Sequence, residues 1–160
     1  MDKIVREIGQ ILSKKGLTVS TAESFTSGAV AKTITSVPGS SIYFKGSVVA
    51  YSEEIKSKVI GVSSKTLKEK GVVHLSTAIE MAQGVSKLME SDFALSTTGL
   101  AGPGGGTSEI PVGTVHLAIL GPGYINSYTE TIKGSRQKVV DKATAIILSR
   151  FHDILSNRTE

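Results

Sequence analysis

The chain has 160 residues, the size of one domain with its own core. Hydrophobic residues make up 39% and charged residues 20%, which excludes a disordered chain, and the absence of cysteine excludes disulfide bonds and thiolate chemistry. The net charge of +4 is mild and aromatic residues are only 5%, so we expect no nucleic-acid partner.

The first segment, residues 1–16, alternates charged and apolar side chains and lacks the apolar core of a signal peptide. Its apolar residues recur at helical spacing, which predicts a helix capped by Asp2 and ended by Gly16. No apolar run in the chain is long enough to span a membrane. We therefore expect a cytoplasmic protein without a membrane partner.

The next elements alternate between strand and helix. The pattern predicts a strand over 17–21, a helix over 28–37, a strand over 46–52, and short helices over 53–60 and 63–71. Pro38 and Gly39 end the second helix, and Glu53 and Glu54 suit the first turn of the third.

The second half begins with a helix over 76–90, where Thr77 and Glu80 have the spacing of a capping box. The elements expected after it are a buried strand over 93–99, an antiparallel pair over 113–120 and 125–132, and a helix from Ser135 to 154. Strands that alternate with helices and end in a hairpin predict an α/β fold. We expect a single domain over residues 1–160, a three-layer α/β/α sandwich with a mixed five-stranded sheet.

Three predicted strands end in unusual polar sequences: AESFTSG (22–28), AYSEEIK (50–56) and TTGLAGPGGG (97–106). Ligands of open α/β sheets bind at the carboxyl ends of the parallel strands. The convergence indicates a functional site, although a helix cap is the ordinary explanation for a segment like AESFTSG.

The glycine tract over 102–106 is not a phosphate-binding P-loop, because no Gly-Lys-Ser/Thr follows it. Its glycines would let backbone N–H groups approach an anion closely. His74, His116 and His152 lie far apart in the sequence without metal-ligand spacing, so we expect no metal site. Ser135 begins a Ser-x-x-Lys sequence but stands at a helix start, where an N-cap is the expected role.

Lys56 lies on the short helix after the second strand. A lysine whose pKa is lowered by burial can act as a base toward a serine. For a lone lysine, a solvated position on a helix is the ordinary alternative.

Six ordered motifs resemble the CinA C-terminal domain family, the nicotinamide-nucleotide amidohydrolases, over about residues 4–155. The motifs are TAESFTSG, VPGSSIYFKGSVVAYSEEIK, IGVS, TTGLAGPGGGT, PVGTV and IKGSR. The resemblance implies the same three-layer α/β/α fold. It also implies hydrolysis of the carboxamide of nicotinamide mononucleotide to nicotinate mononucleotide and ammonia, without a metal or organic cofactor, in a homo-oligomer.

The resemblance also implies the roles of individual residues. It makes Ser24 the nucleophile and Lys56 the base of a Ser-Lys dyad, with Tyr51 and Thr98 as supporting polar groups. Ser24 precedes a predicted helix, whose free N–H groups would favour negative charge there. The residues expected to bind the substrate or its developing charge are Ser41, Arg136, Gly99, Gly102, Gly104 and Gly105.

The chain departs from the family pattern at four positions. Phe25 replaces Cys, Ser27 replaces Gly, Glu53 replaces Asn and Ser135 replaces Asp. None of these changes removes a proposed catalytic group, so they bear on activity and exact substrate rather than on the fold. The alternative function is a catalytically weak nucleotide-sensing or interaction domain. RNA binding is a third reading and rests on the basic charge alone.

Overall fold

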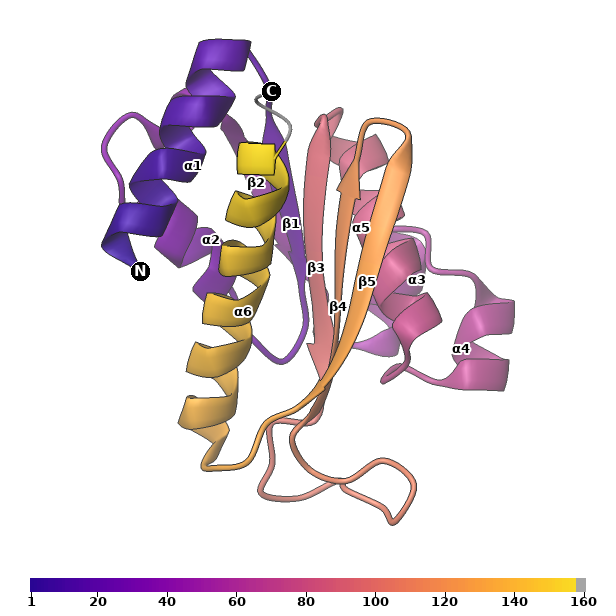
Figure 1. Ribbon diagram of the computed structural model, residues 1–160. Coiled ribbons are helices and arrows are strands. Elements are labelled where there is room, and N and C mark those ends of the chain that lie inside the picture. Colours follow the sequence, from indigo (N-terminus) through magenta and orange to yellow (C-terminus); the bar gives the residue numbers. More distant parts are fainter. Residues whose placement is uncertain (158–160) are drawn as a thin grey trace.

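The computed structural model describes residues 1–157, which form one mixed five-stranded sheet in the order β2-β1-β3-β4-β5 (Figure 1). The strands are β1 (Val19–Glu23), β2 (Phe44–Val49), β3 (Phe93–Gly99), β4 (Thr114–Gly121) and β5 (Tyr124–Thr131). β1 pairs in parallel with β2 and with β3, whereas the β3–β4 and β4–β5 pairs are antiparallel. The predicted α/β fold is confirmed.

Helices cover both faces of the sheet. They are α1 (Asp2–Lys15), α2 (Ala29–Thr35), α3 (Glu53–Lys58), α4 (Ser64–Lys70), α5 (Leu75–Met89) and α6 (Arg136–Asn157), with a 3-10 turn over Ser40–Ile42. Figure 1 shows α1, α2 and α6 on one face and α3, α4 and α5 on the other. The result is the expected three-layer arrangement.

Each helical layer has its own apolar core against the sheet. On one side, Leu12 of α1 and Phe151 of α6 are fully buried with Leu95 of β3. On the other side, Met81 and Val85 of α5 pack in a cluster that contains the small strand residues Ala22, Ala94 and Ala118. Small strand side chains let α5 lie close to the sheet.

Gly84 permits another close contact of α5. A Cβ atom at this position would lie 1.6 Å from the carbonyl oxygen of Ile60. Only glycine allows the helix and this main chain to touch. Ile60 follows α3 by two residues, so the contact fixes the segment that leaves α3.

The first two strands differ in their bounds from the prediction. β1 begins two residues later than expected because the Leu17 N–H donates to Leu12 O, within the turn that ends α1 at Gly16. β2 ends at Val49 because Ser52 already caps α3, its hydroxyl accepting from the N–H of Ile55. The shift places Glu23 inside the sheet and Ser24 directly after it.

Two of the predicted helix caps are wrong. α1 is preceded by Met1 and has no side-chain cap, so Asp2 stands in the first turn, where its charge still suits the helix dipole. The capping box of α5 does not form, because the ring of His74 caps this helix at Ser76. The Thr77 hydroxyl instead donates to Gly71 O.

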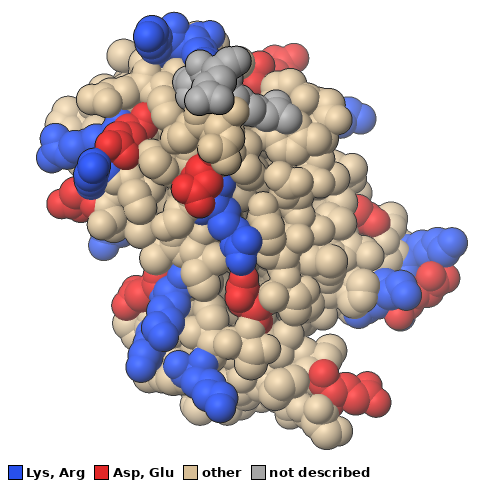
Figure 2. Space-filling view, in the orientation of Figure 1, with Lys and Arg blue, Asp and Glu red and all other residues tan. Residues whose placement is uncertain are grey.

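The expected cap at Ser135 is confirmed, since its hydroxyl accepts from the Lys138 N–H at 3.3 Å. Figure 2 shows Lys and Arg side chains interspersed with Asp and Glu on the face in view, without one large basic patch. None of the helices over residues 1–157 has the length and hydropathy of a membrane span.

Candidate active site

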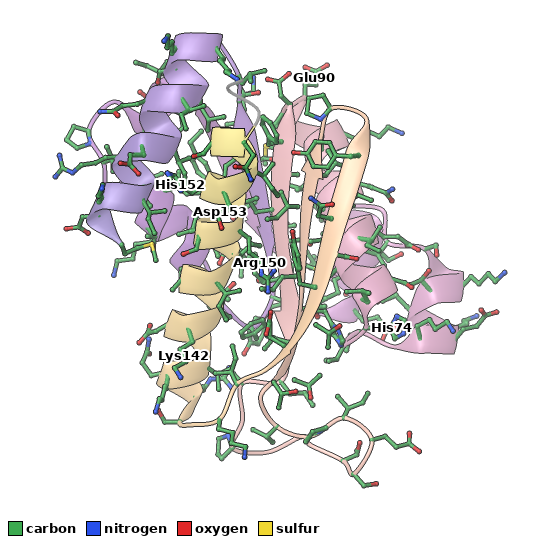
Figure 3. All side chains as sticks on the ribbon, viewed as in Figure 1. His74, Glu90, Lys142, Arg150, His152 and Asp153 are labelled. Atoms are coloured by element: carbon green, nitrogen blue, oxygen red, sulfur yellow. The ribbon has the colours of Figure 1, made fainter. Side chains whose placement is uncertain are left out.

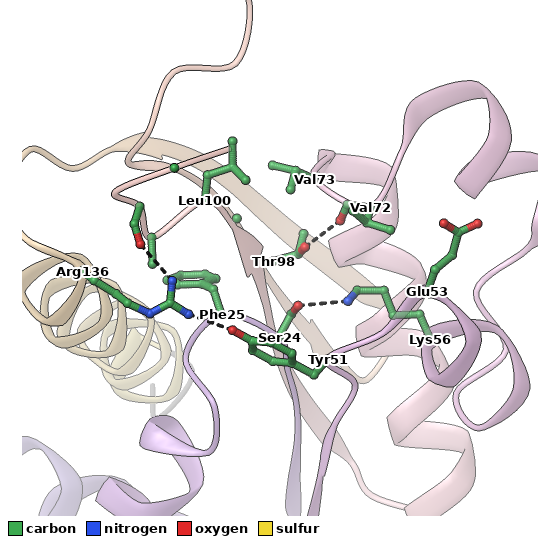
Figure 4. A pocket seen from close by; sticks show the side chains of 14 residues that line it. Ser24, Phe25, Tyr51, Glu53, Lys56, Val72, Val73, Thr98, Leu100 and Arg136 are labelled. Carbon is green, nitrogen blue, oxygen red and sulfur yellow. Dashed lines mark hydrogen bonds between the residues drawn. The ribbon is translucent and has the colours of Figure 1, made fainter. Parts of the chain in front are cut away.

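A cavity of about 390 Å³ lies at the carboxyl ends of the parallel strands (Figure 4). The predicted site residues that line it are Ser24, Tyr51, Lys56, Thr98, Gly99, Gly102, Gly104 and Arg136. Loops after β1, β2 and β3 and the start of α6 supply them. The three polar sequence segments therefore meet at one place, as the strand order predicts.

Two predicted site residues are not brought to this cavity. Ser41 is exposed in the 3-10 turn before β2, and because β1 and β2 are parallel, it lies at the opposite end of the sheet from Ser24. Gly105 is exposed in the glycine loop and does not line the cavity. Within this chain, neither residue belongs to the site.

Ser24 and Lys56 form a buried pair. The Lys56 Nζ atom donates to Ser24 Oγ at 2.9 Å and to the carbonyl oxygen of Ala50 at 2.6 Å. The two side chains belong to residues only 9% and 2% exposed. Burial lowers the pKa of the Lys56 ammonium from 10.5 to about 8, and the nearby Glu53 carboxylate opposes this shift. Lys56 thus loses its proton at a pH where an ordinary lysine keeps it.

Glu23 explains how the loop after β1 is held. Its fully buried carboxylate accepts from the N–H groups of Gly28 at 3.0 Å, Val30 at 3.1 Å and Ala31 at 2.8 Å. It also accepts from the Thr26 hydroxyl at 2.6 Å. We expected the first N–H groups of α2 to be free beside Ser24. That expectation is wrong, because the carboxylate of Glu23 already binds them.

A second hydroxyl extends this network beneath Ser24. Because the carboxylate can only accept, the Thr26 hydroxyl donates to Glu23, and Thr97 must then be the donor in its 2.7 Å contact with Thr26. The N–H of Ser24 donates to Thr97 O at 3.0 Å. The main chain of the predicted nucleophile is therefore tied to β3.

The turn after Ser24 has unusual backbone geometry. Ser27 has φ of 53° and Gly28 has φ of 94°, both in the left-handed region that favours glycine. The family pattern has glycine in place of Ser27. A serine can adopt this conformation, at a cost of roughly 1 kcal/mol.

Arg136, the first residue of α6, joins three segments. Its guanidinium donates to Gly102 O at 2.9 Å and to the hydroxyl of Tyr51 at 2.7 Å. Gly102 has φ of 83°, and a Cβ atom there would lie 2.4 Å from the Val112 side chain, so this position requires glycine. The contact keeps the glycine loop beside Tyr51 at the edge of the cavity.

Backbone N–H groups near the cavity remain available. Those of Phe25, Thr26, Ala101 and Gly102 donate no hydrogen bond to another group of residues 1–157. Ala101 and Gly102 are nevertheless buried. Such N–H groups can stabilise a negatively charged oxygen.

Thr98 also lines the cavity, and its hydroxyl donates to Val72 O at 2.6 Å. This bond holds the segment before α5 against β3, so Val72 and Val73 form an apolar part of the wall together with Leu100. Sequence reasoning did not identify these three residues, because a short apolar run before a helix looks like ordinary core.

The histidines are not all separate in space. The rings of His74 and His116 lie 6.1 Å apart, whereas His152 on α6 lies 2.9 Å from a carboxylate oxygen of Glu7 (Figure 3). Burial, and secondarily His74, lowers the pKa of His116. Over residues 1–157, His, Asp and Glu side chains form no group of three or more that could hold a metal ion.

Comparison with known proteins agrees with this geometry. A family model described as the CinA C-terminal domain matches residues 1–155. A putative competence-damage inducible protein of Halothermothrix orenii is 49% identical over 82% of this chain and 32% of its own length. A CinA-like protein of Fervidobacterium nodosum is 45% identical over 86% of this chain and 34% of its own. The chain thus spans about a third of these relatives.

Solved structures are similar along nearly the whole chain. The crystal structure of the competence damage-inducible protein A of Klebsiella pneumoniae has a TM-score of 0.93 and 29% identity, and covers 97% of this chain and 96% of its own. The competence/damage inducible protein CihA of Agrobacterium tumefaciens has a TM-score of 0.92 and 34% identity, over 97% and 94% of the two chains. This protein belongs to the CinA C-terminal domain family.

Proposed function

We propose that this protein hydrolyses the carboxamide of nicotinamide mononucleotide to nicotinate mononucleotide and ammonia. The observation that carries the proposal is the buried pair of Ser24 and Lys56, with 2.9 Å between Oγ and Nζ, on the wall of a cavity. An amide needs a strong nucleophile, a proton donor for the leaving amine and donors for an oxyanion. Each of these has a candidate group here.

In the first half-reaction, the neutral Lys56 amine removes the proton from Ser24 Oγ while Oγ attacks the amide carbon. The carbonyl oxygen becomes an oxyanion, and unpaired N–H groups of the 101–102 segment or of Phe25 and Thr26 are its candidate donors. When the C–N bond breaks, the Lys56 ammonium gives its proton to the nitrogen, and ammonia leaves. The substrate is now an ester of Ser24.

In the second half-reaction, Lys56 removes a proton from a water molecule, whose oxygen attacks the ester carbon. The bond to Oγ breaks, Lys56 returns the proton to Ser24, and the carboxylic acid leaves. Lys56 can alternate between base and acid because its pKa of about 8 lies near neutral pH.

Arg136 supports an anionic substrate. Its guanidinium lines the cavity and both of its hydrogen-bond acceptors, Gly102 O and the Tyr51 hydroxyl, are uncharged. The positive charge is therefore not neutralised by these partners. A phosphate group is a suitable ligand for it.

Release of ammonia from nicotinamide mononucleotide tests the proposal, with Ser24→Ala as the control protein. We expect turnover by the wild type, both with and without a chelator, and none by the variant. Tight nucleotide binding without turnover would support the sensing-domain alternative instead. An absence of both binding and turnover would contradict the proposed substrate.

A further inference from the structure

The cavity wall carries a carboxylate that the catalytic steps do not use. Glu53 lines the cavity beside Lys56. Within residues 1–157, its carboxylate forms no ion pair and accepts no hydrogen bond. Its neighbour Glu54 is different, because that carboxylate pairs with Lys58 at 2.6 Å and does not line the cavity.

The position of Glu53 makes the cavity electrically two-sided. Figure 4 shows Glu53 on one side of Ser24 and Arg136 on the other. Glu53 is the first residue of α3 and Lys56 follows one turn later, so both side chains leave the same side of this helix. A substrate attacked by Ser24 must lie between the negative charge of Glu53 and the positive charge of Arg136.

A carboxylate near a bound ring favours a cation over a neutral group of the same shape. Two unit charges a few ångströms apart attract by about 1 kcal/mol in water and more in a partly enclosed site. Glu53 is exposed at the cavity rim, which keeps the effect moderate and sensitive to salt. The chain carries this charge at a position where the family pattern has an uncharged asparagine.

We propose that Glu53 is a specificity-determining residue that selects carboxamides on a ring with a fixed positive charge. This inference rests on the proposed function and names the class of substrate for the same site. A pyridinium carboxamide joined to a phosphate has both charges that the cavity walls match. The residue acts on the ring, and Arg136 acts on the anionic end of the molecule.

The test compares oxidised nicotinamide mononucleotide, whose ring is cationic, with its dihydro form, whose ring is neutral and whose phosphate is unchanged. The quantity measured is the ratio of the two kcat/KM values at low ionic strength in weakly alkaline buffer. We expect Glu53→Gln to lower this ratio roughly three- to tenfold, mainly through the KM of the cationic form. The matched control, Glu54→Gln, should leave the ratio unchanged.

The ratio separates specificity from an effect on the base. If Glu53 acts only through Lys56, then Glu53→Gln changes both substrates equally and shifts the pH profile, but the ratio stays constant. An unchanged ratio would overturn the inference. A ratio that falls equally in Glu54→Gln would also overturn it, since any negative charge on α3 would then suffice.

Binding distinguishes this inference from the proposed function. The dissociation constants of both nucleotides are measured by calorimetry on Ser24→Ala and on Ser24→Ala with Glu53→Gln. We expect the second change to weaken the cationic form roughly three- to tenfold and to leave the neutral form unaffected. If the wild type binds with this preference but hydrolyses neither form, the proposed function fails and the inference stands. Absence of binding by both forms overturns both.

Discussion

The Nζ atom of Lys56 lies 2.9 Å from Oγ of Ser24, although the residues are 32 positions apart in the chain. Ser24 follows β1 and Lys56 belongs to α3, so the parallel pairing of β1 with β2 brings the two together. Their proximity depends on the fold, and neither residue has another described side chain that could replace its partner in this contact.

Removal of either member of the pair should abolish activity. We expect Ser24→Ala, Lys56→Ala and the double variant to lose nearly the same factor in kcat/KM, because groups that act as a unit are not additive. Lys56→Arg should not rescue activity, since a guanidinium stays protonated. Lys58→Ala is the control, as this lysine is exposed on the same helix. Near-normal turnover by Ser24→Ala would show that the nucleophile is misassigned.

The activity of the wild type should rise with pH on an ionisation near 8, the pKa of the buried Lys56 ammonium. The base form increases as pH passes this value, so kcat/KM should reach a plateau above it. In Glu53→Gln the limb should move to lower pH, because the carboxylate raises the pKa of Lys56. Profiles measured for both proteins check this, and an unmoved limb would assign the ionisation to another group.

The same pKa makes a prediction about stability. The unfolded chain binds the Lys56 proton up to about pH 10.5 but the folded chain only to about 8, so the free energy of unfolding should rise between these values. Below pH 8 both states hold the proton, and the cost of burying the charge is fully present. Denaturant unfolding of the wild type and Lys56→Met, compared over this pH range, isolates the effect. A constant difference between the two proteins would contradict it.

Arg136 should contribute mainly to substrate binding. We expect Arg136→Ala to raise KM roughly ten- to hundredfold through loss of a charge-assisted contact, with a smaller change in kcat. Tyr51→Phe removes only one acceptor of the guanidinium, so its effect should be smaller. Lys142→Ala is the matched control, because this lysine is exposed on α6 and does not line the cavity. A collapsed kcat at unchanged KM would place Arg136 in the transition state.

Ser27 offers a test of backbone strain. Ser27→Gly should raise the free energy of unfolding by about 1 kcal/mol, because glycine adopts φ of 53° without steric cost. Ser36→Gly is the control, since Ser36 has φ of −67° and gains nothing from glycine. Equal shifts of the two melting temperatures in the same direction would contradict the strain at Ser27.

The alternation of strands and helices allowed the fold to be predicted, and the polar strand ends allowed the convergence of Ser24, Lys56 and Arg136. The bounds of β1 could not be predicted, because a single N–H of Leu17 belongs to the end of α1 rather than to the sheet. The role of Glu23 was also missed. Its acceptor contacts depend on a turn with positive φ, which the serine at position 27 does not signal.

Ser41 was misplaced for a different reason. Motif order does not say at which end of a strand a turn lies, and Ser41 precedes β2 whereas Tyr51 follows it. Membership of the family is established, but the reaction, the homo-oligomer and the cytoplasmic location stay predictions.

The contact between Gly84 and Ile60 links catalysis to a residue outside the cavity. Any side chain at position 84 must displace the carbonyl of Ile60, two residues beyond the helix that carries Lys56. The catalytic distance is thus set partly by an empty space on the far side of that helix. A random screen for inactive variants should recover Gly84 substitutions alongside those of Ser24, and their defect would lie in alignment rather than in chemistry.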